Sequence, residues 1–260
     1  FGAEVEYVIV SHPDFLSAAN ELAAYHEQKD GIRTIVVSPQ QIYNEFSSGK
    51  QDVSAIRDYC KYLYDLPNTT FKYLLLIGDA SYDPKDRISN NTNFIITYQS
   101  SNSVSPLNTF ATDDYFGFLD DNEGLLENDL VDIGIGRLPA KTIEEANNMV
   151  DKIIHYYDKE SRGDWRNMTC FIADDGDDSD GNIHMSQAES LSNIIDDNYN
   201  TYNIHKIYLD DYNQEATPAG QRSPQTRDAI NRRIENGALL INYTGHGGEL
   251  GLTKERIVEL

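Results

Sequence analysis

The sequence has few cysteines, few basic residues and no long apolar run, and each absence excludes a class of protein. Cys60 and Cys170 are its only cysteines among 260 residues, too few for a disulfide framework. No stretch approaches the roughly 20 apolar residues that span a bilayer, and the first residues lack the basic-then-apolar pattern of a signal peptide. We therefore expect a folded chain without a membrane span, and the abrupt ends at Phe1 and Leu260 suggest a part of a longer protein.

Basic residues are outnumbered by acidic ones, 21 against 43, which gives a formal charge of -22. Such a charge repels phosphate backbones and anionic membranes, so nucleic acid is excluded as a partner. Clustered carboxylates suit a hard cation such as calcium, although a solvated acidic surface explains the same composition. The 17 Tyr and 9 Phe supply aromatic bulk that a disordered acidic chain lacks.

Apolar strands alternate with amphipathic helices along most of the chain. Continuous apolar runs such as YVIVS, TIVVS, YLLLIG and TCFIA are typical of buried parallel strands. This alternation predicts an α/β fold of parallel-rich sheets with helices on both faces. From about 80 to 128 the pattern fades into Asn, Ser, Asp and Gly, which indicates a functional or ion-stabilised acidic insertion.

The length favours two lobes. We place an N-terminal α/β lobe, which includes the insertion, at 1–138 and an incomplete C-terminal lobe at 139–260. The transition lies between Ile135 and Lys159, where a long predicted helix could cross between two sheets.

The segment ALLINYTGHGG carries the candidate catalytic residue. An apolar strand runs directly into Gly-His-Gly-Gly, so His246 lies just past a carboxyl end, where open α/β sheets bind ligands. The flanking glycines allow a sharp turn and a close approach to a substrate, and imidazole titrates near neutral pH. The pattern favours proton transfer by His246 over a structural role.

Four blocks resemble the gingipain family of caspase-like cysteine peptidases. YLLLIGD, IGRLPA, INYTGHGG and, within the last, NYTGHG occur in that family's order, and the resemblance covers nearly the whole chain. Within the family, ATDDYFG and GIGRLPA look most like the peptidases that cleave C-terminal sorting signals in type IX secretion. The resemblance implies two side-by-side lobes and a secreted or cell-surface endopeptidase that cleaves exported polypeptides and works with type IX secretion components.

The family's nucleophilic cysteine follows its histidine by a few tens of residues, whereas this sequence ends at Leu260. The resemblance therefore implies a truncated second lobe that is inactive by itself. It assigns acid-base catalysis to His246 and an oxyanion-stabilising amide to Gly247. Cys170 lies well before the end of its predicted strand, which favours burial over nucleophilic use.

An acidic loop follows the strand MTCFIAD, and in the family an acidic residue here orients the histidine. The resemblance favours Asp175 for this role, with Asp174 one residue away. The alternative, a solvated loop or cation site, is left open by the sequence and would involve Asp174, Asp175, Asp177, Asp178 and Asp180.

Gingipains also bind calcium near their third strand, so the resemblance implies a structural Ca²⁺ that joins the insertion to the sheet. Its predicted ligands are Asp79, Asp113, Asp120, Asp121 and Glu123. Arg137 is predicted to satisfy a buried carboxylate or carbonyl groups. The histidines other than His246 share no zinc-ligand spacing and are interpreted as ordinary; His184 lies where arginine-specific relatives carry selecting acids, so that specificity is not implied.

Two other functions are compatible with parts of the sequence. A noncatalytic, calcium-stabilised surface module could bind polypeptides in the same cleft. A nucleotide-binding protein fits less well, because LIGDASYD lacks both Gly-x-Gly-x-x-Gly and the Walker lysine.

Overall fold

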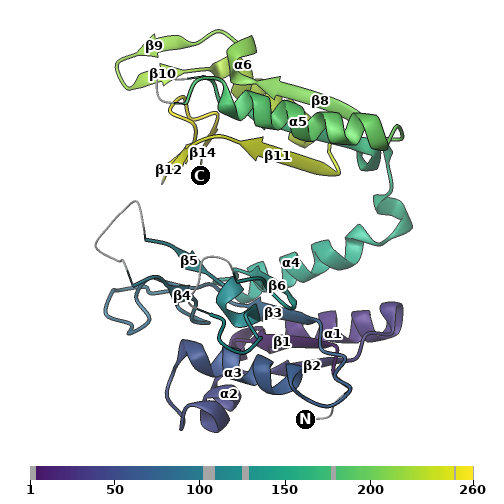
Figure 1. The fold of residues 1–260 in the computed structure, drawn as a ribbon, viewed down its shortest axis with the longest axis vertical. Helices are drawn as coiled ribbons and strands as arrows, with labels where there is room; N and C mark the ends of the chain where they lie inside the picture. Colours follow the sequence, from purple (N-terminus) through teal and green to yellow (C-terminus); the bar gives the residue numbers. More distant parts are fainter. Residues whose placement is uncertain (1–3, 102–108, 125–128, 177–179, 249, 260) are drawn as a thin grey trace. The chain divides into compact units, whose positions relative to one another are not determined.

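The computed structural model describes residues 4–101, 109–124, 129–176, 180–248 and 250–259. They form two compact units, Phe1–Asp158 and Lys159–Leu260 (Figure 1). The boundary lies later than the predicted 138/139, because helix α4 (Ile143–Tyr156) packs on the first unit through Ala146 and Val150. The predicted lobe division at 138/139 therefore differs from the division into compact units at 158/159.

The first unit contains the predicted parallel sheet. Its strand order is β2-β1-β3-β6, and all three pairings are parallel. The strands are β1 (Tyr7–Ser11), β2 (Thr34–Val37), β3 (Tyr73–Ile77) and β6 (Gly134–Leu138). Each matches a predicted apolar run.

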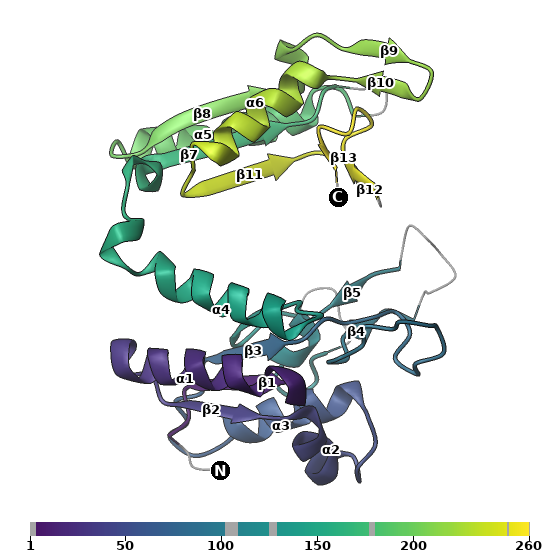
Figure 2. The same cartoon turned by 180° about the vertical axis from the view of Figure 1, so that it is seen from behind.

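Helices cover both faces of this sheet, as predicted (Figures 1 and 2). The alternation along β1 divides the core: Val8 and Val10 pack with α2 (Pro39–Phe46) and α3 (Val53–Tyr64), whereas Ile9 packs with α1 (Leu16–Asp30) and α4. Asp52 caps α3 by accepting from the Ser54 amide at 2.9 Å. Because residues on both faces of the sheet are buried, the sheet is the central layer between two layers of helices.

The acidic insertion contains little regular structure. It includes the short pair β4 (Tyr98–Gln99) and β5 (Ala111–Thr112) and the 3-10 turn Asp114–Gly117. Two arginines join it to the rest of the unit: Arg57 donates to the Phe118 carbonyl at 2.7 Å, and Arg137 donates to the Ile95 carbonyl at 3.0 Å. Cationic side chains therefore do part of the anchoring that was predicted for calcium.

The second unit is built on a smaller parallel sheet, in the order β11-β7-β8. Its strands are β7 (Met168–Ala173), β8 (Asn203–Tyr208) and β11 (Leu240–Thr244). Phe171 and Ala173 pack towards α5 (Ile183–Asn198), while Cys170 and Ile172 pack towards α6 (Pro224–Glu235). Strand β11 is an edge of this sheet, and Leu240 and Ile241 are 48% and 40% exposed.

Two small elements of the second unit were not predicted. They are the hairpin β9 (Glu215–Thr217) with β10 (Gly220–Arg222) and the sheet of β12 (Gly247–Gly248), β13 (Gly251–Leu252) and β14 (Val258–Glu259). The latter begins directly after His246 and fixes the chain beyond it. No helix among the described residues is long and apolar enough to cross a membrane.

Candidate active site

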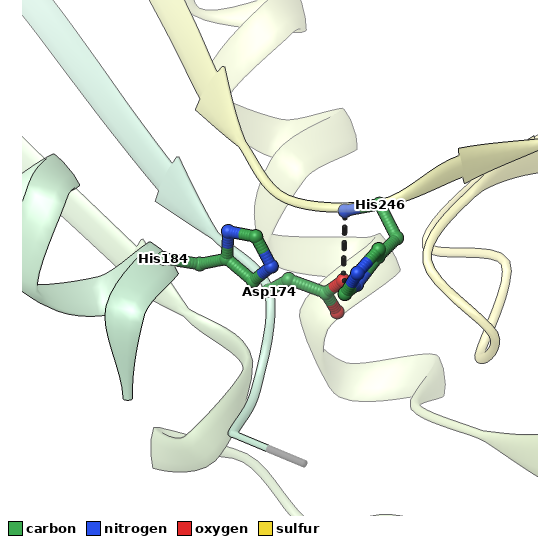
Figure 3. A group of neighbouring side chains, drawn as sticks. All are labelled: Asp174, His184 and His246. Carbon is green, nitrogen blue, oxygen red and sulfur yellow. Dashed lines mark hydrogen bonds and ion pairs between the residues drawn. The ribbon is translucent and has the colours of Figure 1, made fainter. Parts of the chain in front are cut away.

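The site lies at the carboxyl end of the second unit's sheet, where β7 and β11 end beside each other. Ala173 pairs with Thr244, and the Asp174 amide donates to the Thr244 carbonyl at 3.0 Å. This register brings Asp174, the residue after β7, into contact with His246, two residues after the end of β11 (Figure 3). The predicted position of His246 just past a strand is confirmed.

Asp174 holds His246 through two bonds to the same carboxylate oxygen. The Asp174 Oδ2 atom lies 3.0 Å from the His246 backbone nitrogen and 3.1 Å from its Nδ1. A carboxylate only accepts hydrogen bonds, and the Nδ1 contact is shorter than the 3.4 Å that separates Nε2 from Asp180 Oδ2. In the neutral ring the shorter contact favours the proton on Nδ1 and a lone pair on Nε2. Asp174 is 5% exposed and His246 is 52% exposed, so the acid is fixed while the base faces solvent.

The acid that contacts His246 in this structure is Asp174 and not the predicted Asp175, and the orienting role itself stays a prediction. Along β7 the side chains of Cys170 and Ile172 point to one face, and Asp174 continues that alternation. Asp175 accepts instead from Gln214 Nε2 at 2.6 Å. Asp177 and Asp178 of the alternative acidic loop lie outside the described residues.

Gly245 allows Asp174 to lie close to the turn that carries His246. A Cβ atom at this position would lie 2.4 Å from the Asp174 Cβ and 2.4 Å from the Tyr243 hydroxyl oxygen. That hydroxyl donates to the His246 carbonyl at 2.5 Å, and burial, followed by the charge of Asp174, raises the Tyr243 pKa well above its usual range. The Thr253 amide reaches the same carbonyl at 3.0 Å, so both sides of the turn are fixed.

Gly247 is exposed and begins β12. It lines a pocket of about 430 Å³ together with His246, Gly248, Leu250, Gly251, Thr253, Lys254 and Arg256. A concave surface beside the imidazole is where a substrate would lie. The oxyanion role of the Gly247 amide stays a prediction.

His184 also reaches the site, although its sequence context appeared ordinary. It lies in the first turn of α5, and its ring is 4.7 Å from that of His246, centroid to centroid, at an interplanar angle of 85°. Its Nε2 is 3.0 Å from Asp180 Oδ2, which is 3.4 Å from His246 Nε2. The topology offered a signal, because a helix that follows a parallel strand starts at the carboxyl edge of the sheet.

Neither cysteine is placed for catalysis. Cys60 and Cys170 are both fully buried. Burial raises the pKa of the Cys170 thiol to about 11 and that of Cys60 above its usual range, so both stay protonated at neutral pH. The prediction that Cys170 is a buried core residue is confirmed.

The five predicted calcium ligands do not come together as one metal-binding group among the described residues; the clusters there with metal-ligating geometry are Asp174 with His184 and His246, and Asp174 with Asp175 and Glu255. The predicted ligands have protein partners instead. Asp113 pairs with Arg137, Asp121 with Lys61 and Asp79 with Thr92; Asp120 accepts from Tyr64, and Glu123 accepts from the Asp120 amide. Calcium binding stays a prediction.

The contacts of Arg137 confirm the structural role that was predicted for it. Its Nε and Nη2 atoms donate to the two carboxylate oxygens of Asp113 at 2.7 and 2.8 Å. Its Nη1 donates to the Gly78 and Ile95 carbonyls at 2.8 and 3.0 Å. The planar guanidinium therefore joins β3, β6 and the insertion at one point.

Comparison with solved structures identifies relatives of the same fold. Latent PorU from Porphyromonas gingivalis is 33% identical over 61% of this chain and 16% of its own, with a TM-score of 0.53. The Arg-specific cysteine proteinase gingipain R (RgpB) is 20% identical over 98% of this chain and 50% of its own, with a TM-score of 0.68. A complex of the Porphyromonas gingivalis RgpB pro- and mature domains matches at 21% identity and a TM-score of 0.66, over 97% of this chain and 50% of that one.

The chain thus spans half the length of the gingipain structures or less, and a smaller share of PorU. No curated protein matches it. The profile of peptidase family C25 matches residues 2–260, nearly the full sequence. The chain therefore belongs to peptidase family C25, the gingipain family of cysteine peptidases.

Proposed function

We propose that this chain is the histidine-bearing part of a cysteine endopeptidase that cleaves exported polypeptides. The observation that carries the proposal is the bond between His246 Nδ1 and a buried Asp174 carboxylate at the ends of two neighbouring strands. A base held by an acid at one nitrogen, in a ring that lines a pocket, is the arrangement that activates a thiol.

Each residue has a defined part in the proposed reaction. Asp174 fixes the ring and favours the Nδ1–H tautomer, so that Nε2 accepts the thiol proton and later donates it to the leaving amine. The thiolate attacks the peptide carbonyl, and the Gly247 amide donates to the oxyanion that forms. Both steps place the scissile bond in the pocket lined by His246 and Gly247.

The proposed nucleophile lies outside these 260 residues. Both cysteines of the chain are buried, whereas β11 is an edge strand among the residues that the structure describes, and its Leu240 and Ile241 are exposed. We propose that an apolar strand pairs with this edge and presents a cysteine to His246 Nε2. Pairing would cover an edge that otherwise exposes backbone donors and acceptors.

The likeness to PorU supports a finer proposal about substrate and location. We propose that the enzyme acts on the outside of a bacterial cell, on C-terminal sorting signals of proteins exported by a type IX system. The strongly acidic composition agrees with a role on polypeptides and not on nucleic acid.

The test uses a form of the protein that extends about 150 residues beyond Leu260, the size of an ordinary α/β lobe. A thiol-reactive peptide should label one cysteine outside residues 1–260. His246→Ala and Asp174→Asn should each slow labelling by on the order of 10²-fold or more, because the thiol loses its base or the base loses its orientation.

Asp175→Asn is the matched control, since it removes the neighbouring charge and leaves the His246 contact intact. It should change the labelling rate less than threefold, about 0.6 kcal/mol at most. Labelling that is indifferent to both His246→Ala and Asp174→Asn would contradict the proposal and favour a polypeptide-binding module without catalysis.

A further inference from the structure

The second imidazole, His184, has no part in the proposed proton transfer. One ring nitrogen each of His184 and His246 and one carboxylate oxygen of Asp174 lie within 4.8 Å of one another. Figure 3 shows the three side chains converging from different elements: Asp174 after β7, His184 in α5 and His246 after β11. Three donors from three rigid segments form a preorganised group.

The donor set is that of a transition-metal ion. Neutral imidazole nitrogen and carboxylate oxygen are the ligands of Zn²⁺, whereas calcium takes oxygen ligands only. Metal bonds of 2.0–2.1 Å in a tetrahedral site separate two ligand atoms by about 3.3 Å. His246 Nδ1 and Asp174 Oδ2 are already 3.1 Å apart, so an ion can take the place of the proton between them.

The surroundings favour a dication at this point. Asp180 Oδ2 lies 3.0 Å from His184 Nε2 and adds a second carboxylate beside the two rings. His184 is 17% exposed and His246 is 52% exposed, so an ion can enter from solvent without opening the core. The ligand atoms of the three residues lie within 4.8 Å of one another, so binding would draw the His184 nitrogen closer to the other two.

We propose that His184, His246 and Asp174 form a binding site for Zn²⁺ or a chemically similar transition-metal ion. A bound ion occupies His246 and removes the base that the thiol needs. The metal therefore acts as a reversible inhibitor that switches the site off. That consequence rests on the proposed peptidase function, whereas metal binding itself does not.

The test measures binding to residues 1–260 directly and needs no peptidase activity. The chain is stripped with a chelator and titrated with Co²⁺, whose visible absorption near 600 nm is intense only in a tetrahedral site, and with Zn²⁺ by calorimetry at pH 7.5. We expect one equivalent of either ion, and a loss of affinity as the pH falls, because protons compete for the imidazoles. His184→Ala and His246→Ala should each weaken binding at least 100-fold, and Asp174→Asn about tenfold or more.

His155→Ala is the matched control, because His155 is an exposed histidine that also lies near an aspartate, Asp158, at 3.5 Å. It should leave the affinity unchanged, and circular dichroism checks that each variant is folded. Three results would overturn the proposal: unchanged binding in folded His184→Ala, equal loss in His155→Ala, or displacement of Zn²⁺ by millimolar Ca²⁺. The last would assign the ion to the acidic loop, and none of them bears on the labelling test of peptidase function.

Discussion

The two units each hold a carboxylate near the carboxyl end of their sheet, but the partners of the two acids differ. In the first unit Asp113 pairs with the Arg137 guanidinium, and the two side chains are 20% and 12% exposed. In the second unit Asp174 is more buried, while its partner His246 is half exposed. A guanidinium keeps its proton at every working pH, whereas an imidazole can release its proton into the cleft. The first pair therefore stabilises the fold, and the second would orient the base of the proposed peptidase.

The largest effect is expected from a substitution that breaks the ion pair between Arg137 and Asp113. Arg137→Ala removes both bonds to Asp113 and the bonds to the Gly78 and Ile95 carbonyls, and leaves a largely buried carboxylate without its cation. We expect the first unit to lose about 3–5 kcal/mol of unfolding free energy. Urea unfolding followed by far-UV circular dichroism measures the loss, while fluorescence of Trp165, the only tryptophan, reports the second unit separately.

The control for this substitution is an exposed arginine. Arg33 pairs with Glu4 at 2.6 Å, but the two side chains are 48% and 79% exposed. Arg33→Ala should cost less than about 1 kcal/mol, because surface ion pairs contribute little. If Arg137→Ala were equally mild, Arg137 would not be an anchor of the insertion.

Much of the fold could be predicted because parallel strands buried on both faces have a clear signature. β1, β3 and β7 are continuous apolar runs, and each lies where the sequence placed a strand. The pairing of Arg137 with Asp113 could be foreseen only as a type of contact, because the two residues are 24 positions apart and the intervening loop has no periodicity. The predicted lobe boundary lies before α4 and the unit boundary after it, because amphipathic spacing shows that α4 packs on a sheet but not on which one.

The position of His246 could be predicted from the sequence, whereas its neighbours Asp174 and His184 were harder to identify. Gly-His-Gly-Gly after an apolar strand identified His246 without any structural information. The choice between Asp174 and Asp175 depended on the residue at which β7 stops alternating, and strand ends are the least certain feature of a sequence. His184 was missed because its proximity to His246 arises from the parallel topology and not from sequence spacing.

A smaller effect is expected where the backbone itself shapes the reactive pair. Gly245→Ala puts a Cβ within 2.4 Å of the Asp174 Cβ and of the Tyr243 hydroxyl, so one of them must move. We expect a loss of about 1–3 kcal/mol in the second unit, which is typical of overpacking. Urea unfolding followed by Trp165 fluorescence measures it. Faster hydrogen exchange of the His246 amide should show that its bond to Asp174 is weakened.

Gly248→Ala is the matched substitution, since a Cβ there meets no atom within 4 Å. It should change the stability by less than about 0.5 kcal/mol and leave the His246 amide protected. Equal behaviour of the two variants would mean that the turn tolerates a side chain and that Gly245 does not set the distance between Asp174 and His246.

The smallest expected effect concerns a third acid of the second unit, Glu255. It is 3% exposed, its Oε2 has no hydrogen-bond partner among the described residues, and it lies in one cluster with Asp174 and Asp175. Burial raises the pKa of Glu255 above its usual 4.5. The folded state then binds this proton more tightly than the unfolded state, so the stabilisation is complete below about pH 4.5 and is lost as the pH rises through the raised value. Glu255→Gln keeps a neutral side chain and should remove this loss.

The difference in unfolding free energy between Glu255→Gln and the native chain should therefore grow with pH above 4.5, by at most about 1.4 kcal/mol per pH unit. Urea midpoints from Trp165 fluorescence at several pH values measure it. Glu189→Gln should give the opposite sign, because hydrogen bonds from Lys206 and then Tyr208 lower the Glu189 pKa, and that stabilisation is lost as the pH falls. A constant difference across pH for Glu255→Gln would mean that Glu255 is charged in the folded chain. In that case the cluster of Asp174, Asp175 and Glu255 would include a buried, charged Glu255 carboxylate. That carboxylate would need a bound cation, just as the Asp113 carboxylate needs the Arg137 guanidinium.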